Sequence, residues 1–181
     1  MQRIPAADLS KTAGRTREQL DTVQRKMGRV PNLHATMANS PAVLNAYMRL
    51  HDALSQTSLD TRLRELLAVA VAAENGSEYC VAVHTETGRN LRVDEAELHR
   101  AQDGESSDPK TLAALRFAKA LVQKRGKVSD AEVAALKAAG FGNAAVLEIV
   151  ASTVMNIFTN YTNHVAATKM DFPRARVPVA N

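Results

Sequence analysis

The chain's only cysteine lies close in the sequence to side chains that could make it reactive. Glu65, Ser77, Cys80 and His84 follow one another at spacings of twelve, three and four residues, and the last two spacings are those of neighbours on one helix face. If Ser77 caps that helix, Cys80 is its third residue, near unpaired backbone N–H groups and the positive end of the helix dipole. Both favour the thiolate, which is the reactive form of cysteine.

His84 is placed one turn after Cys80 and is suited to accept or return its proton. Glu65 belongs to an otherwise apolar stretch, where an unpaired buried carboxylate would cost several kcal/mol, roughly the penalty of a broken buried ion pair. We therefore expect Glu65 to have a partner, either a histidine or a trapped water. The simplest arrangement is a relay in which Glu65 orients His84 and His84 activates Cys80.

Each of these residues also has an ordinary structural interpretation. A free cysteine is most often a small buried hydrophobe, a serine at a helix start is most often a cap worth about 1 kcal/mol, and a lone histidine or glutamate is most often a packed, hydrogen-bonded residue. The joint spacing of Cys80, His84 and Glu65 is what favours chemistry. Metal binding is the weaker alternative, because a structural zinc site normally takes several thiolates; we expect no metal and no other cofactor.

The elements that must hold these residues are all predicted to be helices. Apolar residues recur at helical spacing, glycine and proline end the segments, and no alternation typical of a strand is found. The helix that contains Glu65 is apolar on almost every side and is expected to be central and buried, whereas Thr16, Ser40 and Ser77 are expected to cap helices. The predicted helices span residues 16–27, 32–38, 41–54, 60–74, 77–89, 93–101, 112–122, 133–139 and 143–168.

Composition indicates one soluble domain in a reducing compartment. A chain of 181 residues with 45% hydrophobic residues can form one core, divided here into an N-terminal arm (1–15), a helical domain (16–173) and a C-terminal tail (174–181). Neither an internal disulfide, a signal peptide nor a membrane-spanning apolar run is indicated, so we predict a cytoplasmic protein without a membrane. The net charge of +4 is scattered and aromatic residues are only 4%, so nucleic acid is not an expected partner.

The run Glu65-x11-Ser77-x2-Cys80-x3-His84 resembles a known motif. Within ELLAVAVAAENGSEYCVAVHT it is similar to the alkylhydroperoxidase motif E-x11-C-x-x-C-x3-H of the AhpD-like and carboxymuconolactone decarboxylase superfamily. The segments GRVPNLHATMANSPAVLNAYMRLHDAL and TNYTNHVAATKMDFP resemble the peroxidase-related branch, so the resemblance covers roughly residues 28 to 173. It implies an all-α, AhpD-like fold, assembly as a homo-oligomer (trimer or hexamer) and a thiol peroxidase reaction.

One position of the motif differs. In the family, the cysteine that matches Cys80 attacks the peroxide and becomes a sulfenic acid, and the cysteine at the position of Ser77 condenses with it to a disulfide. A serine cannot form that disulfide. Ser77 is therefore interpreted in three ways: a natural one-cysteine variant that uses an external thiol, an engineered Cys-to-Ser change, or a member that has lost the redox cycle.

The leading prediction is a peroxiredoxin-type peroxidase that reduces a hydroperoxide through Cys80, with an external thiol or a thiol protein as reductant. The alternatives are a lactone decarboxylase, which needs proton transfer rather than a thiol, and a non-catalytic helical oligomer that binds a small ligand. Tyr79, Asn160 and His164 are further candidates for the pocket, although the helix that carries the last two could equally join subunits. The remaining histidines, His34, His51 and His99, are interpreted as surface or packing residues.

Overall fold

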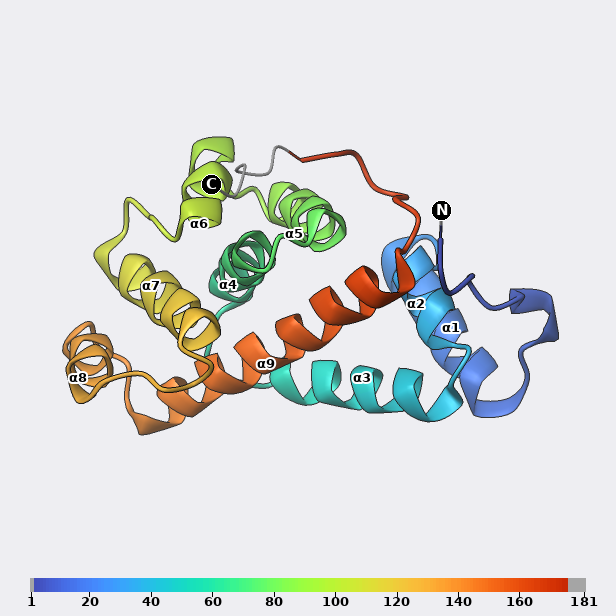
Figure 1. Ribbon diagram of the computed structural model, residues 1–181, viewed down its shortest axis with the longest axis horizontal. Helices are drawn as coiled ribbons and strands as arrows, with labels where there is room; N and C mark the ends of the chain where they lie inside the picture. The colour runs from blue at the N-terminus through green and yellow to red at the C-terminus, as the bar shows by residue number, and fades with distance from the viewer. Residues whose placement is uncertain (1, 176–181) are drawn as a thin grey trace.

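The computed structural model describes residues 2–175, and within them the chain is folded as helices and loops without a strand (Figure 1), which confirms the all-α prediction. Most of the predicted C-terminal tail lies outside the described residues, so the division into arm, domain and tail stays a prediction. The elements are η1 (Leu9–Lys11), α1 (Gly14–Met27), α2 (Asn32–Met37), α3 (Pro41–Leu54), α4 (Thr61–Glu74), α5 (Glu78–Asn90), α6 (Glu95–Asp103), α7 (Pro109–Gln123), α8 (Asp130–Ala138) and α9 (Asn143–Ala166).

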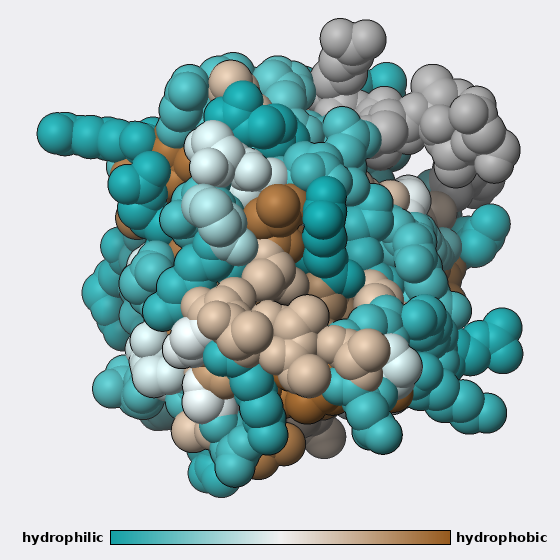
Figure 2. All heavy atoms as spheres, turned by 90° about the vertical axis from the view of Figure 1, so that its left-hand side faces the viewer, coloured by the Kyte–Doolittle hydropathy of each residue, from teal (hydrophilic) through white to brown (hydrophobic). Residues whose placement is uncertain are grey.

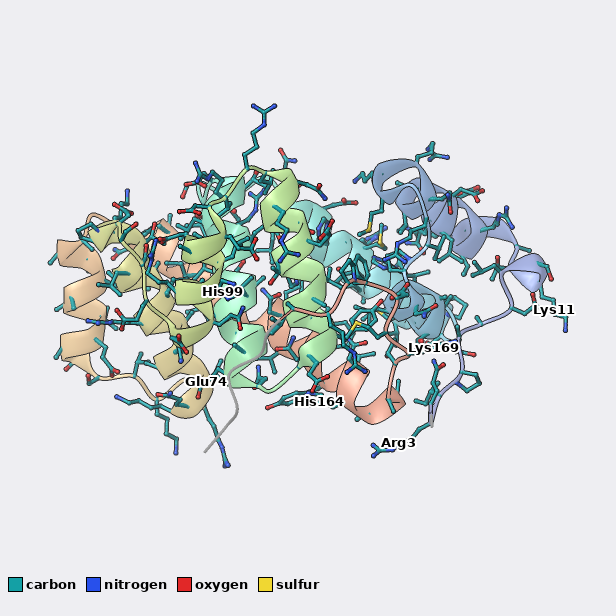
Figure 3. The ribbon with its side chains drawn as sticks, turned by 90° about the horizontal axis from the view of Figure 1, so that it is seen from above. Arg3, Lys11, Glu74, His99, His164 and Lys169 are labelled. Atoms are coloured by element: carbon teal, nitrogen blue, oxygen red, sulfur yellow. The ribbon has the colours of Figure 1, made fainter. Side chains whose placement is uncertain are left out.

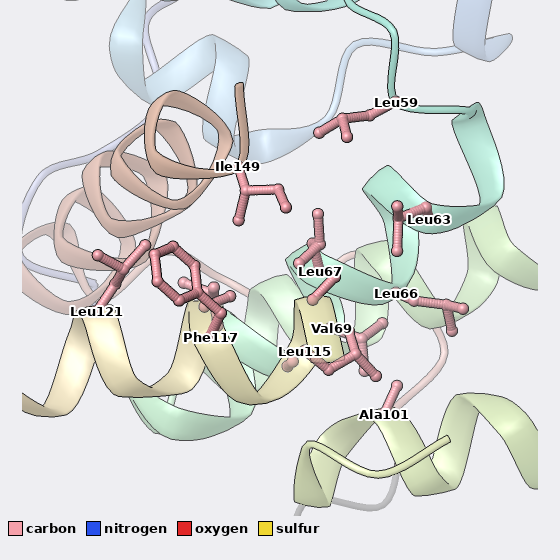
Figure 4. Packing of buried hydrophobic residues seen from close by; sticks show 14 of the residues in the cluster. Leu59, Leu63, Leu66, Leu67, Val69, Ala101, Leu115, Phe117, Leu121 and Ile149 are labelled. Atoms are coloured by element: carbon pink, nitrogen blue, oxygen red, sulfur yellow. The ribbon is translucent and has the colours of Figure 1, made fainter. Parts of the chain in front are cut away.

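Helix α4 is the central helix, as expected from its composition. The side chain of Asp60 caps its first turn by accepting from the N–H of Leu63 at 2.9 Å. Helices α5, α6, α7 and α9 surround it, and Leu67 of α4 packs in one cluster with Phe117 of α7 and Ile149 of α9 (Figure 4). A helix that is apolar all round can be stable only when it is enclosed in this way. The buried residues of α4 are Leu63, Leu66, Leu67, Ala68, Val69, Ala70, Val71 and Ala72.

A turn of three residues, 75–77, folds α5 back along α4. Gly76 has a φ of 67°, in the left-handed region that glycine adopts at little cost, and the N–H of Ser77 donates to the carbonyl of Ala72 at 2.8 Å to complete the end of α4. The expected serine cap is wrong: Ser77 directly precedes α5, but its side chain makes no capping hydrogen bond. Its ψ of 85° lies away from the extended angles that direct a capping side chain toward the first N–H groups of the helix.

Other helix starts differ from prediction by a few residues where a cap was misjudged. Helix α1 begins at Gly14 without a side-chain cap, and Thr16, which was expected to cap it, is a buried residue of its first turn. Helix α6 begins two residues later than predicted, and α7 and α8 each begin three residues earlier. The caps that set these starts are Asp94, Asp108 and Ser129. Of the three predicted caps, only Ser40 caps its helix as expected, by accepting a hydrogen bond from the backbone N–H of Val43.

The N-terminal arm packs on the body of the molecule. The backbone N–H groups of Arg3 and Ile4 donate to the carbonyl of Ala166 at 2.8 and 3.1 Å, and that of Ala7 donates to Ala35 at 2.9 Å. These contacts satisfy backbone groups at the end of α9 and in α2. The arm therefore covers the junction of these two helices.

The chain segment after α9 is held by one carboxylate. Asp171 accepts hydrogen bonds from the hydroxyl of Tyr79 at 2.7 Å, the backbone N–H of Asn32 at 2.9 Å and the guanidinium of Arg29 at 3.2 Å. The same guanidinium lies 4.1 Å from the ring centroid of Phe172. We call these five residues the Asp171 clasp, and it joins the starts of α2 and α5 to the end of the described chain.

Two areas of the surface carry little charge. Helix α9 exposes the apolar residues Leu147, Val154, Tyr161 and Val165, with Glu148 as the one Asp, Glu, Lys or Arg among its 24 residues. The end formed by α7 and α8, viewed in Figure 2, shows a mildly hydrophobic area framed by hydrophilic side chains. Surfaces of this kind are typical of protein contacts, but assembly stays a prediction, as does the cytoplasmic location.

Among the described residues no single helix is long and apolar enough to span a membrane. Helices α8 and α9 meet the length and hydropathy criteria only when taken together, and the pair is bent by 115°.

His34 of α2 is buried and packs edge-on against Tyr47, with ring centroids 5.4 Å apart. The pKa of His34 is lowered from its ordinary value of 6.5 to about 4, chiefly by burial and also by the charge of His51, while the charge of Asp171 opposes the shift. The native protein therefore holds this imidazole neutral where an unfolded chain would protonate it.

We predict that this histidine makes the protein less stable in mild acid. Because the folded pKa lies below the unfolded one, its effect is absent above pH 6.5 and destabilises increasingly as the pH falls toward 4, by about 3 kcal/mol at most. Urea unfolding of the parent and of His34→Gln at pH 7.5 and pH 5 measures the effect, with a smaller pH-dependent loss expected in the variant. Equal losses in the two proteins would contradict the assignment.

We also predict that Asp171→Ala lowers the free energy of unfolding by about 2 kcal/mol or more, because three buried or half-buried donors lose their acceptor. Asp171→Asn, which keeps one acceptor oxygen, should lose less. The control is Asp52→Ala, which removes an exposed carboxylate paired with Lys26. Thermal and urea unfolding measure all three, and a loss at Asp171 no larger than at Asp52 would speak against the clasp.

Candidate active site

A cavity of about 340 Å³ is lined by residues of α1, α2, α3, α4, α5 and α9, and Cys80 lies in its wall. Glu65, Tyr79 and His84 line the same cavity, so the sequence-predicted residues of α4 and α5 are brought together. Most of the remaining wall is apolar, from side chains that include Val23, Met27, Leu33, Met48, Leu54, Ala68, Val83 and Met155. A mainly apolar cavity with a few convergent polar groups is typical of a small-molecule site.

Cys80 is the third residue of α5, as the sequence predicted, and it is 2% exposed. Its Sγ accepts a hydrogen bond from the side-chain amide of Asn163 at 3.1 Å, and the thiol is 3.9 Å from the hydroxyl oxygen of Thr159, to which it donates. That hydroxyl itself donates to the backbone carbonyl of Asn156 at 2.9 Å. The sulfur is therefore held between the first turn of α5 and the polar residues of α9.

His84 and Glu65 form a hydrogen-bonded pair across α4 and α5. His84 Nδ1 lies 2.8 Å from Glu65 Oε2, with the two side chains 22% and 19% exposed. We assign the proton to Nδ1 because the carboxylate can only accept, which leaves Nε2 for proton exchange. This histidine is the partner that the buried carboxylate was expected to have. In residues 2–175 no three His, Cys, Asp or Glu side chains group closely enough to hold a metal ion.

Three of the predicted site residues lie outside the cavity wall. Ser77 is 1% exposed, and its hydroxyl has no hydrogen-bond partner among the described residues. Asn160 is fully buried but accepts from the amide of Asn75 at 2.9 Å, and His164 is exposed near the end of α9 (Figure 3), where its carbonyl accepts from Arg3 at 3.2 Å. The predictions for Asn160 and His164 as pocket residues are wrong, because successive helical residues point about 100° apart and a neighbouring face of α9 lines the cavity.

That neighbouring face carries a buried polar row that sequence reasoning missed. Ser152, Asn156, Thr159 and Asn163 are between 2% and 5% exposed, and the first three line the cavity. Their spacing of four, three and four residues is a helical stripe within an apolar helix. This regular spacing of polar residues was the signal available in the sequence.

The aromatic wall of the cavity was also missed. Tyr47, His34 and His51 line it, with the rings of Tyr47 and His51 6.1 Å apart. Burial, followed by the charges of Cys80 and Glu65, raises the pKa of Tyr47, so its phenol stays protonated; burial also lowers the pKa of His51. His51 was interpreted as a surface or packing residue, although it lies one turn after Tyr47 on the same face of α3. His99 is half-exposed beside Glu95, as a surface residue would be.

Comparison with known proteins relates the central part of the chain to a family. Residues 41–123, which contain Glu65, Cys80 and His84, match the model of the Carboxymuconolactone decarboxylase family. No protein with a curated description matches the sequence. An AhpD-core, peroxidase-related protein from Ralstonia eutropha JMP134 superimposes with a TM-score of 0.86 at 26% identity, over 94% of this chain and 92% of that chain.

Two further solved structures share the fold. A peroxidase-related protein from Silicibacter sp. TM1040 has a TM-score of 0.81 at 23% identity, over 93% of this chain and 92% of that one. The debrominase Bmp8, solved as a cysteine-to-alanine variant in complex with 2,3,4-tribromopyrrole, has a TM-score of 0.80 at 19% identity, over 93% and 91% of the two chains. Together with the family model, these comparisons show that the chain has the AhpD-like helical fold and that residues 41–123 are similar to the carboxymuconolactone decarboxylase family.

Proposed function

We propose that the protein is a thiol-dependent peroxidase that reduces hydroperoxides through Cys80. The observation that carries this proposal is the sulfur of Cys80 in the wall of a cavity that also holds the His84–Glu65 pair. The likeness to peroxidase-related proteins supports it. Other features of the site fit the chemistry, because a helix start and an amide donor both favour a thiolate.

The first half of the reaction consumes the hydroperoxide. His84 Nε2 takes the proton of Cys80, and Glu65 stabilises the resulting imidazolium through Nδ1. The thiolate attacks the terminal oxygen of R–O–O–H, so that an S–O bond forms, the O–O bond breaks and Cys80 becomes a sulfenic acid. The departing alkoxide takes the proton from His84 and leaves as the alcohol R–OH.

The second half restores the thiol with two equivalents of an external thiol. The first condenses with the sulfenic acid to a mixed disulfide and releases water, and the second displaces Cys80 from it and leaves as the external disulfide. Ser77 takes no part in this exchange because a hydroxyl cannot form a disulfide. The low exposure of Cys80 favours a small thiol that enters the cavity over a folded thiol protein.

A second candidate is a lactone decarboxylase, the activity for which the matching family is named. Such an enzyme moves protons on a carbon acid, and the Glu65–His84 pair supplies a base for that purpose without the thiol. The two candidates therefore differ in whether Cys80 is required.

We predict that Cys80→Ser lowers hydroperoxide consumption by about two orders of magnitude or more, because the nucleophile is lost. The measurement is consumption of hydrogen peroxide and of an organic hydroperoxide in the presence of a small thiol, by parent and variant. Consumption at the parental rate by the variant would refute the role of Cys80.

The same pair of proteins also tests the second candidate. If both the parent and Cys80→Ser turn over a lactone acid, the protein is a decarboxylase rather than a peroxidase. Because the debrominase was solved with a bromopyrrole, 2,3,4-tribromopyrrole is a suitable third compound for the panel.

We predict further that Ser77→Cys turns the site into a dithiol. After one equivalent of peroxide the variant should be two hydrogen atoms lighter than its reduced form and have no free thiol, and it should turn over faster with a dithiol reductant. Ser10→Cys, in the exposed N-terminal arm, is the control and should form no intramolecular disulfide. Two free thiols that persist in oxidised Ser77→Cys would count against Ser77 as the position of a missing resolving group.

A further inference from the structure

The amide of Asn163 makes the shorter of two polar contacts between α9 and the sulfur of Cys80. Its Nδ2 lies 3.1 Å from Cys80 Sγ, although the two residues are 83 positions apart in the chain. Asn163 is 5% exposed, and its Oδ1 has no hydrogen-bond partner in the described part of the chain. A buried amide is costly to place without partners, so the contact with sulfur is the feature that accounts for its position.

The two polar neighbours of the sulfur have opposite roles. The Thr159 hydroxyl donates its hydrogen to the carbonyl of Asn156, so its oxygen can only accept from the thiol S–H. Because the single thiol hydrogen already goes to Thr159, the amide oxygen of Asn163 would find no hydrogen on the sulfur. The amide is therefore oriented with its N–H toward the sulfur. When Cys80 loses its proton, the contact with Thr159 loses its hydrogen bond, whereas the bond from Asn163 strengthens because its acceptor now carries a full charge.

We propose that Asn163 is a further catalytic residue of this site, whose amide N–H stabilises the Cys80 thiolate that attacks the hydroperoxide. The role rests on the proposed function of Cys80. It needs no added charge, because a neutral donor that is buried away from water interacts strongly with an anion. Asn163 thus adds to the effect of the start of α5, whose first turn carries the same sulfur.

The rate of Cys80 alkylation by iodoacetamide as a function of pH tests this role without using peroxide. We expect Asn163→Leu to move the midpoint of the rate–pH profile upward by about one to two pH units, the size of a lost hydrogen bond to a charged group. The nearly isosteric Asn163→Asp should move it at least as far, since a carboxylate beside the sulfur opposes a second negative charge. Thr159→Val is the matched control on the same sulfur and should give no upward shift, because the lost group is an acceptor.

The outcomes separate this role from a packing effect and from the function itself. Thermal unfolding first establishes which variants fold, and Asn163→Asp carries the test if the leucine variant does not. An unchanged midpoint in a folded Asn163 variant overturns the proposal, and so does an equal upward shift in Thr159→Val. An upward shift that occurs only in the Asn163 variants upholds Asn163 as the donor to the thiolate. If the parent protein also consumes no hydroperoxide, the peroxidase function is overturned while the role of Asn163 stands.

Discussion

The sulfur, the imidazole and the carboxylate of the site all depend on the turn 75–77 between α4 and α5. Its left-handed Gly76 lets α5 run back along α4, and a β-carbon at this glycine would meet no atom within 4 Å, so the constraint is the backbone angle rather than space. The turn places Cys80 in the first turn of α5 and sets His84 beside Glu65. One additional residue in the helix start would rotate the following side chains by about 100° and separate the pair.

Helix α9 completes the site from a distant part of the chain. Its inner face packs against α4 and α7, and three of the four residues of the polar row line the cavity. Two members of the row donate to backbone carbonyls of their own helix: the amide of Asn156 to Ser152 and the hydroxyl of Thr159 to Asn156, each at 2.9 Å. Asn163 instead uses its amide on the sulfur of another helix. Through Asn163 and Thr159 the row contacts the sulfur of Cys80.

The features that the sequence predicted are those fixed by local spacing. Cys80 as the third residue of α5 and the pairing of Glu65 with His84 both follow from helices joined by a short turn. What was missed arises from packing between distant segments, as with Asn163, whose amide meets the sulfur of another helix. The error on His164 has a clear cause: α9 exposes apolar residues and buries polar ones, so the polarity of its residues does not tell which face points inward. The Ser77 cap failed because one residue had to serve both the end of α4 and the start of α5.

The tyrosines that line the cavity also contribute to the intrinsic fluorescence of the protein. The chain has three tyrosines and no tryptophan, and Tyr47 and Tyr79 both line the cavity while Tyr161 lies exposed on α9. Tyrosine emission is quenched by nearby groups that accept a proton or stack on the ring, and the hydroxyl of Tyr79 already donates to the Asp171 carboxylate. A compound that enters the cavity changes the surroundings of two of the three fluorophores. The protein therefore contains its own optical reporter of occupancy, and binding can be followed in the unlabelled chain.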